Sequence, residues 1–543
     1  MNQFEETDIV VVGAGAAGSV IAARLSEDPK LNVTVVEAGR DDLHPYIHIP
    51  AGFIKIIFNE NYIWPFQTEP TENTTGRKIN VLQGRVVGGS SSLNGLIYNR
   101  GQPADFDGWA QMGNKGWDYE SILPYFRRSE TFYGKGDPGV RGKDGPLQIS
   151  ELKWIHEICD SFIQGAGEFG LPRTNDYNGG DQEGVGYFQR IIKGRRRISA
   201  ARAYLKPALK RRNLRLVTRA VVAKVIFEGK RAVGIEYITG EGKGERRVLK
   251  ARRQVILSSG TVNTARLLQL SGIGNADDLA SIGVPVLQEL AGVGRNLRDH
   301  YSVRVVAGAK NSVTINELSK PPRLWGQQMR WLFGQPSIIT LSPSLVHIFA
   351  KSREGLETPD LQGVFSPASY KAGFVSLLDD YPGMTCGFWA HKPESTGYVR
   401  ALSIDPMAKL LIQPNYLAAR NDVETLIRGI KLARKLVKTG PMKKYFDHEQ
   451  LPGKDVQSDD ELEAFAKQYG VSSWHLVGTA KMGSGDDRTA VVDHRLRVHG
   501  LQSLMIADAS IMPTSPSANT FASTVMIAEK ASDMLKADLA SDR

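Results

Sequence analysis

Short apolar runs bounded by glycine and polar residues divide this chain into predicted strands. The runs at 8–12, 33–36, 255–257 and 504–506 hold mostly Val, Ile, Leu and Met. Continuous apolar runs of this length are typical of strands buried on both faces, as in a parallel sheet. A helix predicted from about Ser19 to Leu25 separates the first two runs, so the pattern indicates a β-α-β unit of an α/β fold.

The turn between the first strand and this helix carries the motif GAGAAG at 13–18. Gly13 would make the tight turn, Gly15 would let the backbone approach a pyrophosphate, and Gly18 would let the helix pack on the sheet. Glu37 ends the second strand, at the distance where an acidic residue accepts a ribose 2′-OH. The sequence therefore predicts a dinucleotide site at the N-terminus of this helix.

Two other glycine-rich segments differ in what they predict. The same spacing recurs at 165–170, but it follows an amphipathic pattern at 154–158 rather than a strand, so we expect no second nucleotide site there. Residues 84–95 combine glycines with three serines and Asn94. Backbone with so few side chains can lie against a flat or charged ligand.

Further elements follow along the chain. The runs at 215–218, 220–226 and 233–237 predict an antiparallel meander. A helix is expected from Ser259-Gly260 to about Leu270, and a long one from about Asn519-Thr520 to Leu535, its N-terminus facing the cleft. The less patterned residues 306–469 are predicted to supply walls on the substrate side.

Composition and charge narrow the class of protein. A chain of 543 residues with 41% hydrophobic and 23% charged positions predicts a globular protein of two or more domains. The net charge of +10 is concentrated between Lys193 and Arg219, which holds eleven basic residues and no acidic one. We expect this segment to be a solvated face, with attraction of anionic substrates or peripheral association with a membrane as the alternatives. No zinc-finger or aromatic-basic pattern indicates nucleic-acid binding.

Cysteine and histidine usage adds little chemistry. Cys159 and Cys386 are too few for a disulfide framework or a thiolate metal site, and we expect a cytoplasmic protein without a leader or membrane span. His44 and His48 are four residues apart, but Pro45 lies between them, so no helical metal pair is expected. His300 is predicted to be a structural hydrogen-bonding residue.

Two longer segments carry a resemblance to a known family. Residues 84–107 are similar throughout to the first signature of the glucose-methanol-choline (GMC) flavin oxidoreductases, and residues 260–274 to the second. The second departs only at Ala265, where Pro or Ser is usual. The similarity extends over nearly the whole chain, and within the family it is strongest to choline dehydrogenases and short-chain alcohol or sorbose dehydrogenases.

The resemblance implies a Rossmann-like FAD-binding domain interleaved with an α+β substrate-binding domain built on an antiparallel sheet. The first would take residues 1–155, 201–305 and 470–543, and the second 156–200 and 306–469. Some members tether FAD through a histidine where this chain has Leu93, so the FAD is expected to be non-covalent. The residues expected to contact it are Gly13, Gly15, Ala16, Ala17, Gly18, Glu37, Ala38, Arg85, Val87, Gly89, Ser90, Asn94, Gly95, Val222, Ser259, Gly260, Asp508, Ala509, Asn519 and Thr520.

The resemblance also implies the reaction. His475 matches the family's base and Asn519 its partner, for oxidation of a primary alcohol to an aldehyde with hydride transfer to flavin N5. A neutral imidazole is suited to accept the hydroxyl proton. Trp474, His475 and Asn519 are the expected substrate contacts, although Trp474 could equally pack in the core. Helix N–H groups at Asn519 would stabilise negative charge on the reduced flavin.

Several alternatives stay open at this point. The substrate could be choline, a sugar or a polyol, and the electron acceptor could be oxygen, a quinone or an artificial acceptor. A lyase or decarboxylase of the same fold would not need His475 with Asn519. A nicotinamide dehydrogenase would not need the 84–107 segment, and a nucleotide-binding regulatory module would not need a base.

Overall fold

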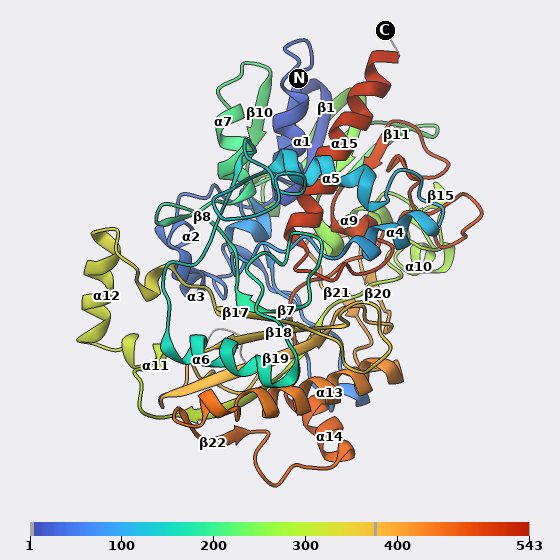
Figure 1. Ribbon diagram of the computed structural model, residues 1–543. Coiled ribbons are helices and arrows are strands. Elements are labelled where there is room, and N and C mark those ends of the chain that lie inside the picture. The colour runs from blue at the N-terminus through green and yellow to red at the C-terminus, as the bar shows by residue number, and fades with distance from the viewer. Residues whose placement is uncertain (1–4, 374–376, 542–543) are drawn as a thin grey trace.

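Strand β1 lies inside a mixed sheet, between β2, which follows it after one helix, and β13, which comes from a distant part of the chain. The computed structural model describes residues 5–373 and 377–541 (Figure 1). The strand order of the first sheet is β10-β2-β1-β13-β12-β11, with β24 also paired to β13. Its members are β1 (Glu5–Val12), β2 (Val33–Val36), β10 (Leu214–Val217), β11 (Val221–Glu228), β12 (Arg231–Ile238), β13 (Arg246–Leu257) and β24 (Leu504–Ile506).

The parallel part of this sheet is the predicted dinucleotide-binding core. Residues 9–12 of β1 are at most 3% exposed, because the sheet is covered on both faces and β-branched side chains fill it. The expected meander needs one correction. β10 pairs in parallel with β2 at one edge, while β11, β12 and β13 form the antiparallel hairpins at the other.

Helices α1 (Ala16–Leu25) and α15 (Phe521–Ser541) pack together over this sheet (Figure 1). Gly18 permits the close packing of α1, because a Cβ there would lie 1.8 Å from the carbonyl oxygen of Gly13. Arg24 of α1 donates from Nε to the buried carboxylate of Glu529 on α15, at 2.8 Å. The predicted long helix therefore exists, although it begins after Asn519 and continues past Leu535.

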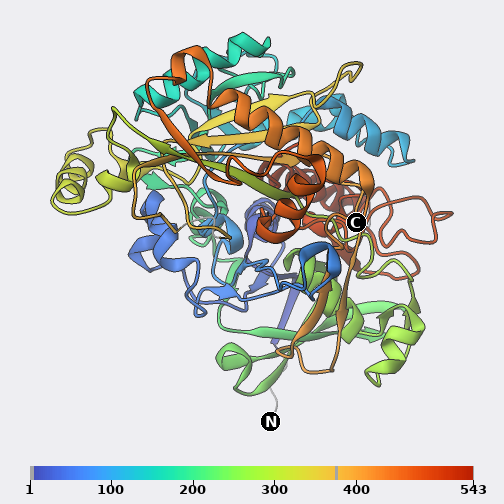
Figure 2. The ribbon, with the colours of Figure 1, turned by 90° about the horizontal axis from the view of Figure 1, so that it is seen from below.

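A second, antiparallel sheet forms the other half of the molecule. Its order is β22-β16-β19-β18-β17-β7, with β23 paired to β16. Helix α13 packs on one face of it, along β16 and β19 (Figure 2). The elements are β7 (Gly184–Tyr187), β16 (Tyr301–Ala309), β17 (Val346–Ala350), β18 (Leu361–Ser366), β19 (Gly383–Ala390), β22 (Phe446–Leu451), β23 (Val471–Ser472), α6 (Glu157–Ala166), α13 (Arg420–Leu436) and α14 (Asp459–Tyr469).

The two sheets match the fold class expected from the sequence. β16 runs through residue 305 and pairs with β23, so strands of the second sheet lie on both sides of the expected boundaries at 305 and 470. The division of the chain at those residues stays a prediction. The other main elements are α2 (Pro45–His48), α3 (Phe53–Ile56), α4 (Pro103–Gln111), α5 (Tyr119–Ser129), β5 (Glu130–Phe132), β6 (Leu147–Ser150), β8 (Arg190–Lys193), β9 (Arg196–Arg197), α7 (Lys206–Ala208), α9 (Gly260–Leu270), α10 (Ala276–Ser281), α11 (Ile315–Leu318) and α12 (Arg323–Leu332).

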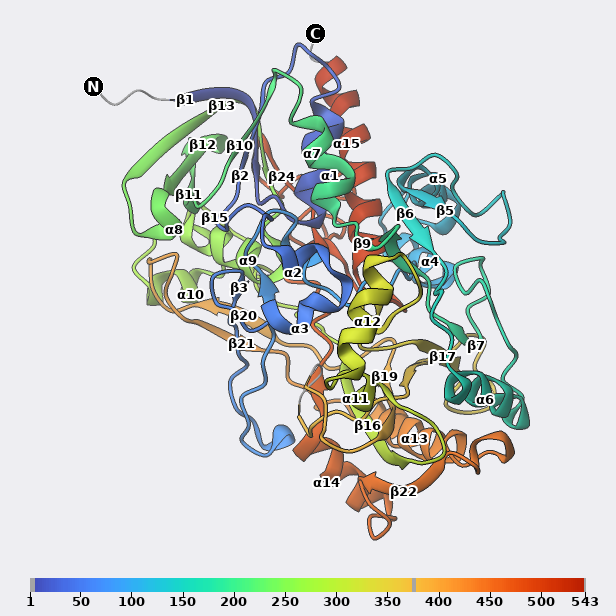
Figure 3. The same cartoon turned by 90° about the vertical axis from the view of Figure 1, so that its left-hand side faces the viewer.

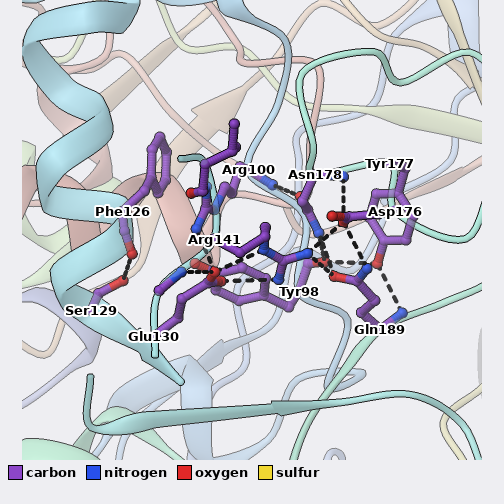
Figure 4. A network of polar contacts seen from close by, with 12 residues as sticks. Tyr98, Arg100, Phe126, Ser129, Glu130, Arg141, Asp176, Tyr177, Asn178 and Gln189 are labelled. Atoms are coloured by element: carbon purple, nitrogen blue, oxygen red, sulfur yellow. Dashed lines mark hydrogen bonds and ion pairs between the residues drawn. The ribbon is translucent and has the colours of Figure 1, made fainter. Parts of the chain in front are cut away.

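A buried polar network links segments on either side of residue 155 (Figure 4). The Glu130 carboxylate pairs with Arg100 at 2.6 Å and with Arg141 Nε at 2.8 Å. The Arg100 backbone N–H donates to Asn178 Oδ1 at 2.8 Å. These three charged side chains are at most 3% exposed, and a buried charge is tolerated only when it is paired in this way. The network therefore fixes the 84–150 region against the segment that leads into β7.

Candidate active site

A cavity of about 350 Å³ lies where the two halves meet. Most of the residues expected to contact FAD or substrate line it, although they come from eight separate stretches of chain. They are Gly13, Gly15, Ala16, Ala17, Glu37, Ala38, Gly89, Ser90, Asn94, Gly95, Val222, Ser259, Gly260, Trp474, His475, Asp508, Ala509, Asn519 and Thr520.

Three expected contacts lie outside the cavity wall. Gly18 packs against Gly13, as described above. Val87 is fully buried in the core behind the glycine-serine loop. Arg85 donates to the carbonyl of Glu60 at 3.1 Å and lies 5.2 Å from the Trp64 ring. These residues support the walls of the site rather than forming its surface.

The two glycine-rich loops form one continuous cradle. The Gly88 N–H donates to the carbonyl of Ala14 at 2.7 Å. A Cβ on Gly89 would lie 2.8 Å from the Cα of Gly15, so the glycine-serine loop has no room for a side chain at this contact. Gly15 caps α1 without a side-chain hydrogen bond. The first N–H groups of α1 therefore remain available to a ligand phosphate in the cavity.

Glu37 lies at the end of this cradle where the sequence predicts the adenosine half of FAD. Its two carboxylate oxygens accept the N–H groups of Ala14 and Gly39, each at 2.8 Å. Burial raises the pKa of Glu37 to about 7, although these two amides and Arg85 act in the opposite direction. A ribose hydroxyl placed here would add a further hydrogen bond to a carboxyl group that the protein has already positioned.

These observations fit a bound FAD. The cradle would exclude any side chain that competes with a diphosphate, and Asp508 holds the N-terminus of α9 by accepting from Gly260 N at 2.9 Å. The beginning of α15, from Asn519 to Phe521, also lines the cavity. Leu93 lies at the wall and offers no nucleophilic atom for a covalent bond.

The basic segment 193–219 is not entirely a solvated face. Arg197 is 1% exposed, and its Nη1 donates to Asn94 Oδ1 at 2.7 Å. Burial lowers the pKa of Arg197 to about 9. Its guanidinium therefore fixes the glycine-serine loop from behind. The run of three arginines at 195–197 did not indicate this role. Side chains alternate along β9, so Arg197 is buried while Arg196 is exposed.

A hydrogen bond from the backbone N–H of His475 to Asp299 and the strained backbone of Trp474 position His475 at the cavity. Asp299 Oδ1 accepts the His475 N–H at 2.7 Å and the His300 N–H at 2.9 Å. Trp474 has a φ of 61°, which is uncommon for a bulky residue and costs free energy. Trp474 Nε1 donates to the carbonyl of Asn80 at 2.9 Å, which holds the indole ring at the cavity wall.

The hydrogen bonds around His300 fix the tautomer of His475. His300 Nε2 lies 2.8 Å from the His391 carbonyl oxygen, which can only accept, so a neutral His300 carries its proton there. His300 Nδ1 is then an acceptor, and it lies 3.0 Å from His475 Nδ1. His475 must therefore be protonated at Nδ1, which leaves the lone pair of Nε2 directed toward Asn519.

Asn519 is oriented by a second polar residue. Its Nδ2 lies 3.0 Å from His475 Nε2, and its Oδ1 accepts from Gln362 Nε2 at 3.2 Å. The amide nitrogen of Asn519 thus donates to the unprotonated nitrogen of His475. Two chains of hydrogen bonds, one through His300 and one through Gln362, agree on the same protonation of His475.

The local environment favours the neutral imidazole. Burial first, and His300 second, lower the pKa of His475 well below 6.5. Burial likewise lowers the pKa of His300 to about 4. Both rings are therefore uncharged near neutral pH, as a proton-accepting base requires.

Sequence reasoning missed three positioning residues and one charged residue at this site. Asp299 and Gln362 were not predicted, nor were Ser472, whose hydroxyl donates to Asp299 Oδ2, and Arg304, which lines the cavity; His300 was expected to serve structure alone. Only His300 had a usable signal, since it directly follows Asp299 and the motif at 292–297. Asp299 lies just before β16, and the others lie on β16, β18 and β23, whose pairing brings together residues far apart in sequence.

Metal and membrane features complete the description. Within residues 5–373 and 377–541, no group of three or more His, Cys, Asp or Glu side chains is placed to hold a metal ion. His44 caps Tyr46 N, and His48 Nδ1 lies 3.0 Å from Arg202 Nη1. Over the same residues, no helix is both long and apolar enough to cross a bilayer.

Sequence comparisons place the whole chain among known enzymes. Two family models described as GMC oxidoreductase match residues 7–302 and 393–528. The mitochondrial choline dehydrogenase of Homo sapiens is 39% identical, over 98% of this chain and 90% of that protein. The oxygen-dependent choline dehydrogenase of Brucella anthropi is 38% identical, over 97% and 95% respectively.

Solved structures give the same result. Pyridoxine 4-oxidase from Mesorbium loti superposes with a TM-score of 0.88 at 30% identity, covering 98% of this chain and 99% of that one. A formate oxidase gives a TM-score of 0.91 at 25% identity, with full coverage of both chains. With the cradle and the His475 site described above, these matches show that the chain belongs to the GMC oxidoreductase family and is an FAD-dependent oxidoreductase that oxidises alcohols.

Proposed function

We propose that His475 is the base that activates a primary alcohol in this enzyme, and that Asn519 is its partner. The observation that carries the proposal is the tautomer of His475, whose Nε2 lone pair faces the cavity beside Asn519 Nδ2. A hydroxyl placed beside both atoms would donate its proton to Nε2 and accept from the Asn519 amide. Bound FAD supplies the hydride acceptor for the carbon.

The protein then has to stabilise the proton on His475. The imidazolium would keep donating from Nδ1 to His300, which stays neutral because burial disfavours its charged form. Asp299 holds the backbone of both histidines, so the two rings keep their relative position as the proton arrives. Asn519 would donate to the alkoxide oxygen and so stabilise the charge left on it.

FAD would be held by the cradle and by three helix N-termini. The expected contacts stay those predicted from the sequence, with Gly13 to Ala17 and Glu37 at the adenosine half and Gly89 to Gly95 near the ring. The N-terminus of α15 would favour negative charge in that part of the cavity. Because Leu93 lines the wall, we propose that the FAD is bound without a covalent link.

Charge in the cavity favours a neutral substrate over choline. Arg304 lines the wall formed by the antiparallel sheet, two residues after Ser302 on β16. Burial lowers its pKa to about 10, which leaves the guanidinium charged near neutral pH. Among the described residues of the cavity wall, the carboxylates are Glu37 and Asp508, and backbone amides at the dinucleotide loops hold both.

No described carboxylate of that wall therefore faces a quaternary ammonium group, whereas the partly buried guanidinium of Arg304 does. A trimethylammonium substrate would lose its hydration beside Arg304 without a compensating charge. We accordingly propose a neutral primary alcohol as the substrate class. The relatives are named for choline, pyridoxine and formate, so their names alone do not select among these substrates.

The electron acceptor and the location are separate proposals. Oxygen or a quinone would take the electrons, and one relative is named as oxygen-dependent. A cytoplasmic location is supported by two cysteines, Cys159 and Cys386, that are both buried and unpaired. Peripheral association with a membrane surface is proposed from the basic segment 193–219.

The test of the proposed function is a turnover assay on the purified holoenzyme. Aliphatic, aromatic and polyol primary alcohols are compared with choline, using oxygen, a quinone analogue and an artificial dye as acceptors. We expect bleaching of the flavin absorbance and aldehyde formation with a neutral primary alcohol. Flavin reduction by each alcohol is also measured under anaerobic conditions, where no electron acceptor is needed. If no alcohol reduces the flavin there, the proposal is contradicted.

A further inference from the structure

Helix α12 stands away from the rest of the protein and exposes a large apolar surface. Figures 1 and 2 both show it at the outer edge of the molecule. None of its residues is buried. Trp325 is 61% exposed, Met329 50% and Leu332 55%, and Phe333, which follows the helix, is 75% exposed. A contiguous exposed apolar patch of this kind marks an interaction site rather than ordinary surface.

A second group of exposed apolar side chains lies on α2 and α3. The turn 338–340, which follows α12, contacts residues 50–52 between α2 and α3, and Figure 3 shows α2, α3 and α12 on the side of the molecule that faces the viewer. We call this surface the docking face. It is formed by the exposed side chains of Leu43, Tyr46, Ile54, Phe58, Trp325, Met329, Leu332 and Phe333.

The docking face is basic as well as apolar. The exposed basic side chains of the segments 43–58, 193–196 and 320–340 include Lys55, Lys193, Arg195, Arg196 and Arg330, and these segments contain no Asp or Glu. Arg195 donates to the backbone carbonyl of Trp331 and lies 5.7 Å from its ring centre, so the basic segment borders α12 directly. Arg202 reaches His48 of α2 on the other side. The unexplained cluster of positive charge thus borders the exposed apolar side chains.

We infer that the docking face binds the surface of an anionic phospholipid bilayer. Amphipathic helices with Trp, Leu and Phe on one side and Arg or Lys beside them lie in the bilayer interface, where apolar burial and attraction to anionic headgroups add together. A second copy of the chain is a poorer occupant, because a symmetric contact would bring two net-basic faces against each other.

This inference gives a location to the peripheral association proposed above and is independent of the identity of the alcohol. Phe53 and Ile57 of the α3 region line the cavity, while Ile54 and Phe58 belong to the docking face. Pro343, just after the 338–340 turn, also lines the cavity. Docking would therefore bring this cavity wall next to the bilayer, where an apolar alcohol or a lipid-soluble acceptor is concentrated.

The experiment is co-sedimentation of the FAD-loaded enzyme with vesicles of phosphatidylcholine alone or mixed with phosphatidylglycerol. Trp325→Ser/Phe333→Ser removes two apolar side chains of the docking face, and Met112→Ser/Ile155→Ser removes two that are 53% exposed elsewhere. We expect the wild type and the control pair to bind the anionic vesicles. The α12 pair should bind roughly tenfold or more weakly.

A charge variant and an activity measurement separate the remaining outcomes. Lys55→Glu/Arg196→Glu should lower binding to anionic vesicles, and added salt should weaken wild-type binding. Flavin absorbance and turnover of a water-soluble alcohol should stay unchanged in all variants, so a failure of the proposed function is recognised separately. The inference is overturned if the wild type ignores anionic vesicles, if the α12 pair binds as the control pair does, or if the α12 pair instead converts a dimer into a monomer.

Discussion

His475 and His300 face each other through their Nδ1 atoms, 3.0 Å apart, and only one of these atoms can carry a proton when both rings are neutral. The carbonyl oxygen of His391 lies 2.8 Å from His300 Nε2 and can only accept, so a neutral His300 carries its proton on Nε2. The proton between the two Nδ1 atoms therefore belongs to His475. The backbone of β19 and its continuation thus determine the protonation of a side chain at the cavity. His300 acts through His475 and is a positioning residue rather than a catalytic one.

The first prediction concerns this positioning role. His300→Leu should lower kcat about tenfold or more, because His475 then has no partner that fixes its tautomer. His300→Asn places an amide oxygen where Nδ1 was and should recover much of the loss. The measurement is kcat with pH profiles for both variants at saturating substrate. Equal kcat and pH profiles in the Leu variant, the Asn variant and the wild type would remove His300 from the mechanism.

The second prediction separates the base from its partner. His475→Ala should lower turnover by roughly 10²-fold or more, the usual contribution of a positioned proton acceptor. Asn519→Ala should cost less, since the lone pair of His475 Nε2 remains. Both variants should keep their FAD, because neither side chain belongs to the glycine cradle at Gly15 and Gly89. A His475 variant with near-normal turnover and intact flavin absorbance would refute the assignment.

The third prediction follows from the lowered pKa of His475. A base must be unprotonated to act, and burial shifts its protonation to lower pH. For a neutral alcohol, the midpoint of the acid limb of the kcat/KM profile should therefore lie below pH 6.5. Burial raises the pKa of Asp299 to about 6. Protonation of Asp299 would therefore also lower kcat/KM as the pH falls. Comparison with Asp299→Asn distinguishes the two groups, and a wild-type midpoint above pH 6.5 would contradict the expected environment of His475.

The strongest sequence patterns predicted the dinucleotide half well. Gly13, Gly15 and Glu37 belong to one local β-α-β unit, so their spacing alone indicates their geometry. His475 and Asn519 were named from family similarity, and their contact at 3.0 Å depends on the meeting of β23 with the start of α15. No local pattern encodes that meeting.

The residues that sequence reasoning missed share a physical cause. Gln362 orients Asn519 from the middle of an antiparallel sheet, where a glutamine in an apolar strand gives no periodic signal. Arg197 is buried within a run of three arginines whose composition indicated solvent exposure. Both are tertiary effects, because the partner that stabilises each polar group is distant in sequence.

The fourth prediction concerns the attachment of FAD. Leu93 lies at the cavity wall, at the position where the family resemblance implies a histidine tether in some members, and a leucine side chain cannot form that bond. Acid or heat precipitation should therefore release intact FAD into the supernatant. The measurement is flavin absorbance in supernatant and pellet, with a covalently flavinylated protein treated in parallel. Flavin that stays in the pellet after washing would contradict this expectation.

The last prediction tests the charge of the cavity with two substrates of equal shape. Choline and 3,3-dimethylbutan-1-ol differ by a quaternary nitrogen in place of a carbon, so their ratio of kcat/KM reports electrostatics with little change in packing. Arg304 lines the cavity and stays charged near neutral pH. The wild type should therefore prefer the neutral alcohol.

Arg304→Gln should raise the choline-to-alcohol ratio by roughly tenfold to a hundredfold, the repulsion expected between like charges several ångströms apart at an effective dielectric constant near 20. Arg304→Lys keeps the charge and is the matched control, so its ratio should stay near that of the wild type. A wild-type preference for choline would refute the neutral-substrate proposal. An unchanged ratio in Arg304→Gln would place the selectivity elsewhere in the cavity, because the guanidinium charge is then not what excludes the quaternary ammonium group.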